Sequence, residues 1–133
     1  MATIPPDIAE RESHATILVV DDNRDSALAI AKLLQFSGHS AISAFSAREA
    51  VDLLDEMPID LVLSDIRMPD VDGFDLLRVL RHRFPALPII LMSGLPITSD
   101  DVVPTGASIL KKPFTMVDLQ GALRQKLPRS TGT

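Results

Sequence analysis

Short apolar runs recur along the chain, and segments with apolar residues at helical spacing lie between them. Runs of four to eight apolar residues that alternate with helical patterns are typical of parallel strands buried on both faces. A sheet of such strands is therefore the first prediction. The runs are Ile17–Val20, Ile59–Asp65, Ile89–Met92 and Ser108–Leu110, with a weaker strand at Ser40–Ala44.

The segments between the runs predict helices with clear start and stop signals. Gly38 and Pro58 end the first two helices, and Ser46 with Glu49 forms a capping-box pattern at the start of the second. The segment after the fourth strand is a poor helix, because Pro104 and Gly106 stop it. The expected helices are Arg24–Ser37, Ser46 to Pro58, Asp72–Phe84, a turn or two within Thr98–Val103, and Thr115 to Leu127.

Five β-α units of this size predict an α/β fold. We expect a flavodoxin-like, doubly wound five-stranded parallel sheet of order 2-1-3-4-5, with helices on both faces and a short or irregular fourth helix. Residues 15–128 would form this domain, between a flexible arm at 1–14 and a tail at 129–133. The carboxyl ends of the strands meet at one edge of such a sheet. Polar residues cluster at those ends: Asp21, Asp22, Asp65, Ser93 and Lys112.

Composition narrows the functional classes. The chain has 133 residues and a formal net charge of -5, which argues against a general nucleic-acid binder and predicts no direct contact with nucleic acid. It contains neither an apolar stretch of membrane-spanning length nor an N-terminal signal pattern, so we expect no membrane contact and a cytoplasmic location. The absence of cysteine excludes disulfides, thiol chemistry and zinc held by thiolates.

The predicted cluster of acids indicates metal-assisted phosphoryl chemistry. Carboxylates crowded into one cleft repel each other, and a bound cation or a proton relieves that repulsion. Oxygen ligands without His or Cys suit Mg²⁺, which Mn²⁺ can replace. A carboxylate can also act as a nucleophile and form an acyl phosphate. Asp22 and Asp65 would hold the metal, while Lys112 and Ser93 would contact the other phosphoryl oxygens.

These residues resemble the receiver domain of two-component response regulators. The resemblance covers about residues 16–127, and its motifs occur in order. They are the acidic pair Asp21-Asp22, the segment from Asp65 through Met68-Pro69 to Asp72-Gly73, the hydroxyl of Ser93, and Lys112-Pro113-Phe114.

The resemblance implies a role for each site residue. Asp65 would be the phosphorylation site, and Asp21, Asp22, Asp65 and the backbone carbonyl of Arg67 would bind Mg²⁺. Lys112, rather than Lys111, would be the family lysine, with a cis bond to Pro113. The partner would be a histidine kinase or a histidine phosphotransfer protein. The domain would be a monomer or a weak dimer and would catalyse only its own phosphorylation and dephosphorylation.

The chain departs from the family pattern near the fifth strand. Most receivers carry Tyr or Phe three residues before the lysine, whereas this chain has Ile109, whose branched side chain is stiff at χ1. The stretch from Ser93 to Lys112 is also about three residues short and contains Pro96 and Pro104. Signalling is therefore not expected to use an aromatic rotamer switch, and the segment 94–106 becomes the candidate responsive element.

Other interpretations compete with a phosphoacceptor. Each motif alone has an ordinary structural explanation, such as a loop opening at Asp21-Asp22 or a solvated pair at Lys111-Lys112. A phosphatase similar to the haloacid dehalogenase type would place its nucleophile in a D-x-D after the first strand, and Asp21-Asp22 lacks that spacing. A phosphorylation-independent adaptor with the same fold is the main alternative, although every acceptor-site group is present.

Overall fold

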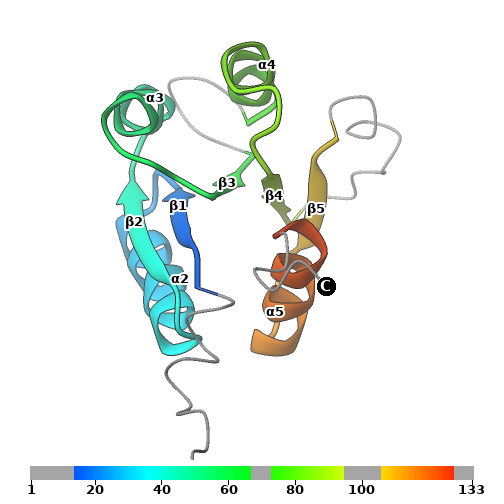
Figure 1. The fold of residues 1–133 in the computed structure, drawn as a ribbon. Coiled ribbons are helices and arrows are strands. Elements are labelled where there is room, and N and C mark those ends of the chain that lie inside the picture. The colour runs from blue at the N-terminus through cyan, green and yellow to red at the C-terminus, as the bar shows by residue number, and fades with distance from the viewer. Residues whose placement is uncertain (1–13, 67–72, 95–105, 128–133) are drawn as a thin grey trace, which may run out of the picture.

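The computed structural model describes residues 14–66, 73–94 and 106–127, and its strands form one parallel sheet (Figure 1). The sheet order is β2-β1-β3-β4-β5, which confirms the predicted topology. The strands are β1 Thr16–Val20, β2 Ser40–Ala44, β3 Leu61–Asp65, β4 Ile89–Ser93 and β5 Ser108–Lys111.

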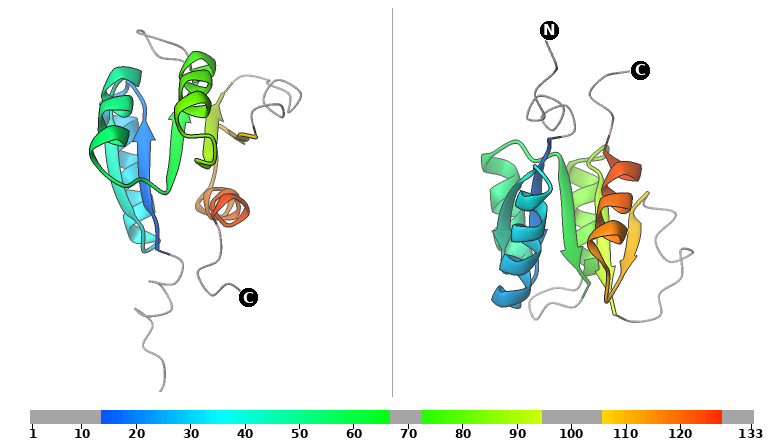
Figure 2. Two further views of the ribbon diagram at one scale, coloured as in Figure 1. Left: turned by 45° about the horizontal axis from the view of Figure 1, so that its top comes forward. Right: turned by 90° about the horizontal axis from the view of Figure 1, so that it is seen from below.

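Helices cover both faces of the sheet (Figure 2). Alternate residues of β1 show the division: Ile17 and Val19 pack with α2 and α5, whereas Leu18 and Val20 pack with α3 and α4. The three central strands are almost fully buried, because each has a helical layer on both sides. The helices are α2 Arg24–Phe36, α3 Ala47–Glu56, α4 Gly73–Arg83 and α5 Met116–Lys126.

The predicted helix ends hold with small differences. Gly38 has φ 94° after the end of α2, which is the left-handed conformation expected of a glycine stop. Ser46 caps α3 by accepting from the Glu49 N–H, but the returning bond to Glu49 Oε1 comes from the Phe45 N–H rather than from the cap residue itself. Thr115 caps α5 as expected, and Asp118 completes a full capping box there.

One predicted strand differs in extent, and other predicted segments fall outside the described residues. The third strand begins at Leu61 instead of Ile59, since Asp60 closes a turn against β1: its carboxylate accepts from the Thr16 N–H and its own N–H donates to the Thr16 carbonyl. The predicted weak helix at 98–103, residues 1–13 of the predicted arm at 1–14, and the predicted tail at 129–133 lie outside the described residues. In the part of the chain that the structure describes, no helix is long and apolar enough to span a membrane.

Two histidines connect the start of β1 to the start of β2. His14 Nδ1 lies 2.6 Å from the Gly38 carbonyl oxygen and donates to it, and the Ala15 N–H donates to His39 Nδ1 over 3.0 Å. No role was predicted for either ring from the sequence. Burial lowers the pKa of His39 below its usual value, and the nearby ring of His14 lowers it further. His39 is therefore held neutral, because a proton on Nδ1 would replace the acceptor that Ala15 needs.

We expect His39 to make the fold less stable in mild acid. The unfolded ring takes up a proton below about pH 6.5 while the folded ring resists it, so this contribution is present above that pH and is lost as the pH falls below it. The thermal midpoint of the parent should drop between pH 7.5 and 5.5 more steeply than that of His39→Asn, whose amide oxygen can still accept from Ala15. His82→Asn, at an exposed position of α4, is the control. Equal pH slopes in the parent and His39→Asn would contradict this interpretation.

Candidate functional site

Asp21 follows β1 directly and is buried at the carboxyl edge of the sheet. Its N–H donates to the Ala44 carbonyl, which continues the β1–β2 pairing by one residue, and only 1% of the residue is exposed. Its Oδ1 accepts from the Asn23 N–H over 3.0 Å. Among the described residues Oδ2 is a buried oxygen without a hydrogen-bond partner. A buried carboxylate oxygen of this kind is unusual unless a ligand completes it.

Burial and nearby charges act on the Asp21 carboxylate together. Burial raises its pKa above the usual value, and the negative charges of Asp65 and Asp22 raise it further. The Asn23 N–H and the Lys112 ammonium oppose that rise. The neighbouring Asn23 also caps α2 by accepting from the Ser26 N–H, and this fixes the turn that carries Asp21 and Asp22.

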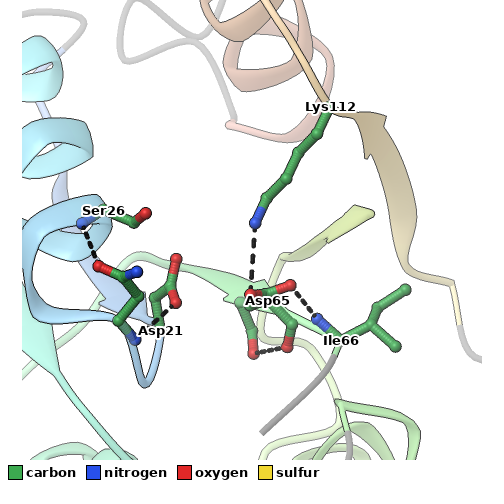
Figure 3. A network of polar contacts seen from close by, with 7 residues as sticks. Asp21, Ser26, Asp65, Ile66 and Lys112 are labelled. Carbon is green, nitrogen blue, oxygen red and sulfur yellow. Dashed lines mark hydrogen bonds and ion pairs between the residues drawn. The ribbon is translucent and has the colours of Figure 1, made fainter. Parts of the chain in front are cut away.

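Asp65 is the last residue of β3, and its carboxylate points toward Lys112 (Figure 3). Its Oδ1 accepts from the Ile66 N–H over 2.8 Å, and its Oδ2 lies 3.3 Å from Lys112 Nζ. The side chain of Asp65 is 17% exposed, so it is accessible from outside while surrounded by protein on most sides. A partly shielded carboxylate of this type interacts more strongly with a neighbouring ammonium than a fully solvated one would.

Lys112 reaches the site from the end of β5. Its N–H donates to the Ser93 carbonyl over 2.7 Å, which holds the start of the following loop against the end of β4. The Lys112-Pro113 bond is cis, as the resemblance to receiver domains implied. Ser93 is buried at the end of β4, where it pairs with Lys111. The sheet register thus places Ser93 beside the end of β3, because the preceding residue, Met92, pairs with Asp65.

Three carboxylates form a cluster that could hold a metal ion. Asp21, Asp22 and Asp65 each offer one oxygen, and these oxygens all lie within 4.8 Å of one another. The donor set contains only oxygen, which suits Mg²⁺. The partnerless Oδ2 of Asp21 fits the same interpretation, because a cation would give it the interaction that it lacks among the described residues.

Most residues of this site were predicted from the sequence. The structure places Asp21, Asp22, Asp65, Ser93 and Lys112 at the ends of β1, β3, β4 and β5, as expected. Arg67, the predicted carbonyl ligand, lies outside the described residues. Asn23 was not predicted from the sequence, although an Asn directly before an amphipathic helix is a recognisable cap. Ser64 was not predicted either, since its only signal was a hydroxyl within an apolar strand.

Comparison with known proteins agrees with this geometry. The family model of the response regulator receiver domain matches residues 17–124, and the chain belongs to that family. It is therefore a receiver domain of the kind found in response regulators of two-component systems, which is a class of signalling domain.

Relatives of known sequence are full-length regulators. The chain is 36% identical over 118 residues to the response regulator MprA of Mycolicibacterium vanbaalenii, covering 86% of this chain and 51% of MprA. It is 35% identical over 124 residues to the transcriptional regulatory protein CpxR of Escherichia coli K12, covering 86% of this chain and 50% of CpxR. The chain thus spans about half the length of these relatives.

Solved structures confirm the fold. The signal receiver domain of an HD domain-containing protein from Pseudomonas fluorescens Pf-5 superposes with a TM-score of 0.80 at 27% identity, covering 90% of this chain and 99% of that one. The chemotaxis protein CheY4 of Vibrio cholerae superposes with a TM-score of 0.79 at 26% identity, covering 86% of this chain and 99% of CheY4.

Proposed function

We propose that this domain accepts a phosphoryl group from a phosphohistidine onto Asp65. The observation that carries the proposal is the environment of the Asp65 carboxylate. One oxygen is bound by the Ile66 N–H, the other faces the Lys112 ammonium, and the carboxylate lies close to those of Asp21 and Asp22. An accessible carboxylate beside a cation and a metal-binding cluster has what a phosphoryl acceptor needs. Receiver domains of response regulators interact with histidine kinases, so a kinase or a phosphotransfer protein is the proposed donor.

The chemistry is an in-line displacement. An oxygen of Asp65 attacks the phosphorus, the P–N bond to the donor imidazole breaks, and the new O–P bond gives an acyl phosphate. Lys112 stays close to the phosphoryl oxygens and stabilises their charge, and Ser93 is proposed to donate its hydroxyl to another of them. Asp21, Asp22, Asp65 and the Arg67 carbonyl would hold Mg²⁺, which neutralises phosphoryl charge when bound. Mn²⁺ could replace it.

The adaptor alternative predicts the same fold without covalent modification. Incubation with a small phosphodonor such as acetyl phosphate and Mg²⁺, followed by intact mass measurement, separates the two functions. The phosphoacceptor gains the mass of one phosphoryl group, and the adaptor gains nothing. Hydrolysis of a generic phosphoester at a steady rate would instead favour a phosphatase.

Two adjacent lysines provide a matched test of the site. We expect Lys112→Ala to slow phosphoryl uptake by about 100-fold, the usual effect of removing one stabilising donor from a transition state. Lys111→Ala should react at the parent rate, because Lys111 is an exposed residue of the edge strand β5. Comparable rates in both variants, measured with the same phosphodonor and Mg²⁺, would show that Lys112 does not act on the phosphoryl group.

A further inference from the structure

Ser64 places a hydroxyl in the apolar layer beneath α3 and α4. It is the next-to-last residue of β3 and is only 1% exposed. Side chains alternate along a strand, so Ser64 lies on the same face as Val62, which packs in the core cluster with Ile66 and Leu91. A buried hydroxyl without a hydrogen bond is unfavourable in such a layer. Ser64 Oγ is hydrogen-bonded: it donates to the Asp65 carbonyl oxygen over 2.9 Å.

The Asp65 carbonyl lies where the strand pairing with β1 has ended. The β1–β3 register runs only to the pair of Val20 with Ser64, so Asp65 is one residue past it. On the other side of the same peptide group, the Ile66 N–H donates to the Met92 carbonyl over 3.2 Å and to Asp65 Oδ1 over 2.8 Å. The peptide between Asp65 and Ile66 is thus held at its carbonyl by Ser64. Its N–H binds the Asp65 carboxylate (Figure 3).

We propose that Ser64 is a positioning residue for Asp65: its hydroxyl fixes the Asp65–Ile66 peptide, and that peptide fixes the rotation of the acceptor carboxylate. This inference rests on the proposed function. With Oδ1 bound to Ile66, the second oxygen is directed at Lys112. Without the Ser64 hydroxyl the peptide is held only through its N–H, which donates to the Met92 carbonyl and to Asp65 Oδ1. The peptide then rotates more freely, the bond from Ile66 to Asp65 weakens, and the carboxylate spends less time in the orientation needed for attack. Orientation of the reacting atoms is a large part of the rate in such a step.

The test compares Ser64→Ala with Ser64→Thr, which keeps the hydroxyl. Ser64→Ala should take up phosphoryl groups from acetyl phosphate about fivefold more slowly at saturating Mg²⁺, the effect of one neutral hydrogen bond. Amide hydrogen exchange at Ile66, measured without phosphodonor, should become faster by a similar factor. Ser64→Thr should restore both values. Ser108→Ala, at a half-buried serine of β5, is the control and should change neither.

The Ile66 amide separates positioning from general stability and from the proposed function. Faster exchange at Ile66 with unchanged exchange in the centres of β1 and β4 supports positioning. Unchanged exchange at Ile66 in Ser64→Ala, or a parent rate of uptake in that variant, overturns it. If the parent protein takes up no phosphoryl group, the proposed function fails while the Ile66 measurement still decides the role of Ser64. If Ser64→Thr does not fold, Ser64→Ala alone decides.

Discussion

Asp65→Asn is expected to abolish phosphoryl uptake from acetyl phosphate. The amide of asparagine has nearly the same shape as the carboxylate, but it is not a nucleophile and cannot form an acyl phosphate. The other parts of the site stay in place, since Lys112 is held by its bond to the Ser93 carbonyl and Asp21 by its bond to Asn23. Intact mass after incubation with Mg²⁺ and phosphodonor measures the result.

Asp52→Asn is the matched control for that experiment. Asp52 lies on the exposed face of α3, so its substitution should leave uptake unchanged. A phosphorylated Asp65→Asn variant with the stoichiometry of the parent would mean that another residue accepts the group. Loss of phosphoryl uptake in both variants would indicate a general effect of charge, and would not identify Asp65 as the acceptor.

Mg²⁺ is expected to stabilise the folded domain. Three carboxylate oxygens lie within 4.8 Å of one another, and one of them belongs to the buried Asp21. A cation relieves this repulsion only in the folded state, because the unfolded chain separates Asp65 from Asp21 and Asp22. At a concentration of about 100 times the dissociation constant, the stabilisation is roughly 2.7 kcal/mol. A thermal scan with and without millimolar Mg²⁺ measures it.

Asp21→Asn should have opposite effects with and without the metal. Without Mg²⁺ the variant should be more stable than the parent by about 1 kcal/mol, because it removes a buried charge and its amide can donate to the neighbouring carboxylates. That corresponds to a rise of about 4 °C in thermal midpoint. Mg²⁺ should add little to the stability of the variant, so the parent should be the more stable of the two when the metal is present. Asp25→Asn, in the first turn of α2 beside the site, is the control and should respond to Mg²⁺ as the parent does. A thermal midpoint of the parent that does not change on addition of Mg²⁺ would contradict the proposed metal site.

The sequence predicted the topology because this fold follows from simple patterns. Apolar runs such as that of β3 are buried between two helical layers, right-handed connections place helices on both faces, and five such units fit the order that the sheet adopts. The convergence of Asp21, Asp65 and Lys112 follows directly, since residues just past parallel strands meet at one edge. Chain order alone therefore placed the charged groups of the site together.

Details that depend on side-chain direction did not follow from the pattern. Nothing in the sequence distinguishes the bound Oδ1 of Asp21 from its partnerless Oδ2, because that difference depends on how the Asn23 turn is built. The bond between Ser64 and the Asp65 carbonyl arises from the precise point at which β1 stops pairing with β3. The contacts of His14 and His39 at the starts of β1 and β2 join residues far apart in the chain, and a periodic pattern carries no such information.

The most direct test of the proposal that Asp65 accepts the phosphoryl group is to locate that group on the chain. The protein is phosphorylated with acetyl phosphate and Mg²⁺ and reduced with borohydride, which converts an aspartyl phosphate to homoserine, and the peptides are sequenced by mass spectrometry. We expect homoserine at position 65, with Asp21 and Asp22 unchanged. Homoserine at position 21 or 22, or a phosphorylated protein with aspartate still at position 65, would contradict it.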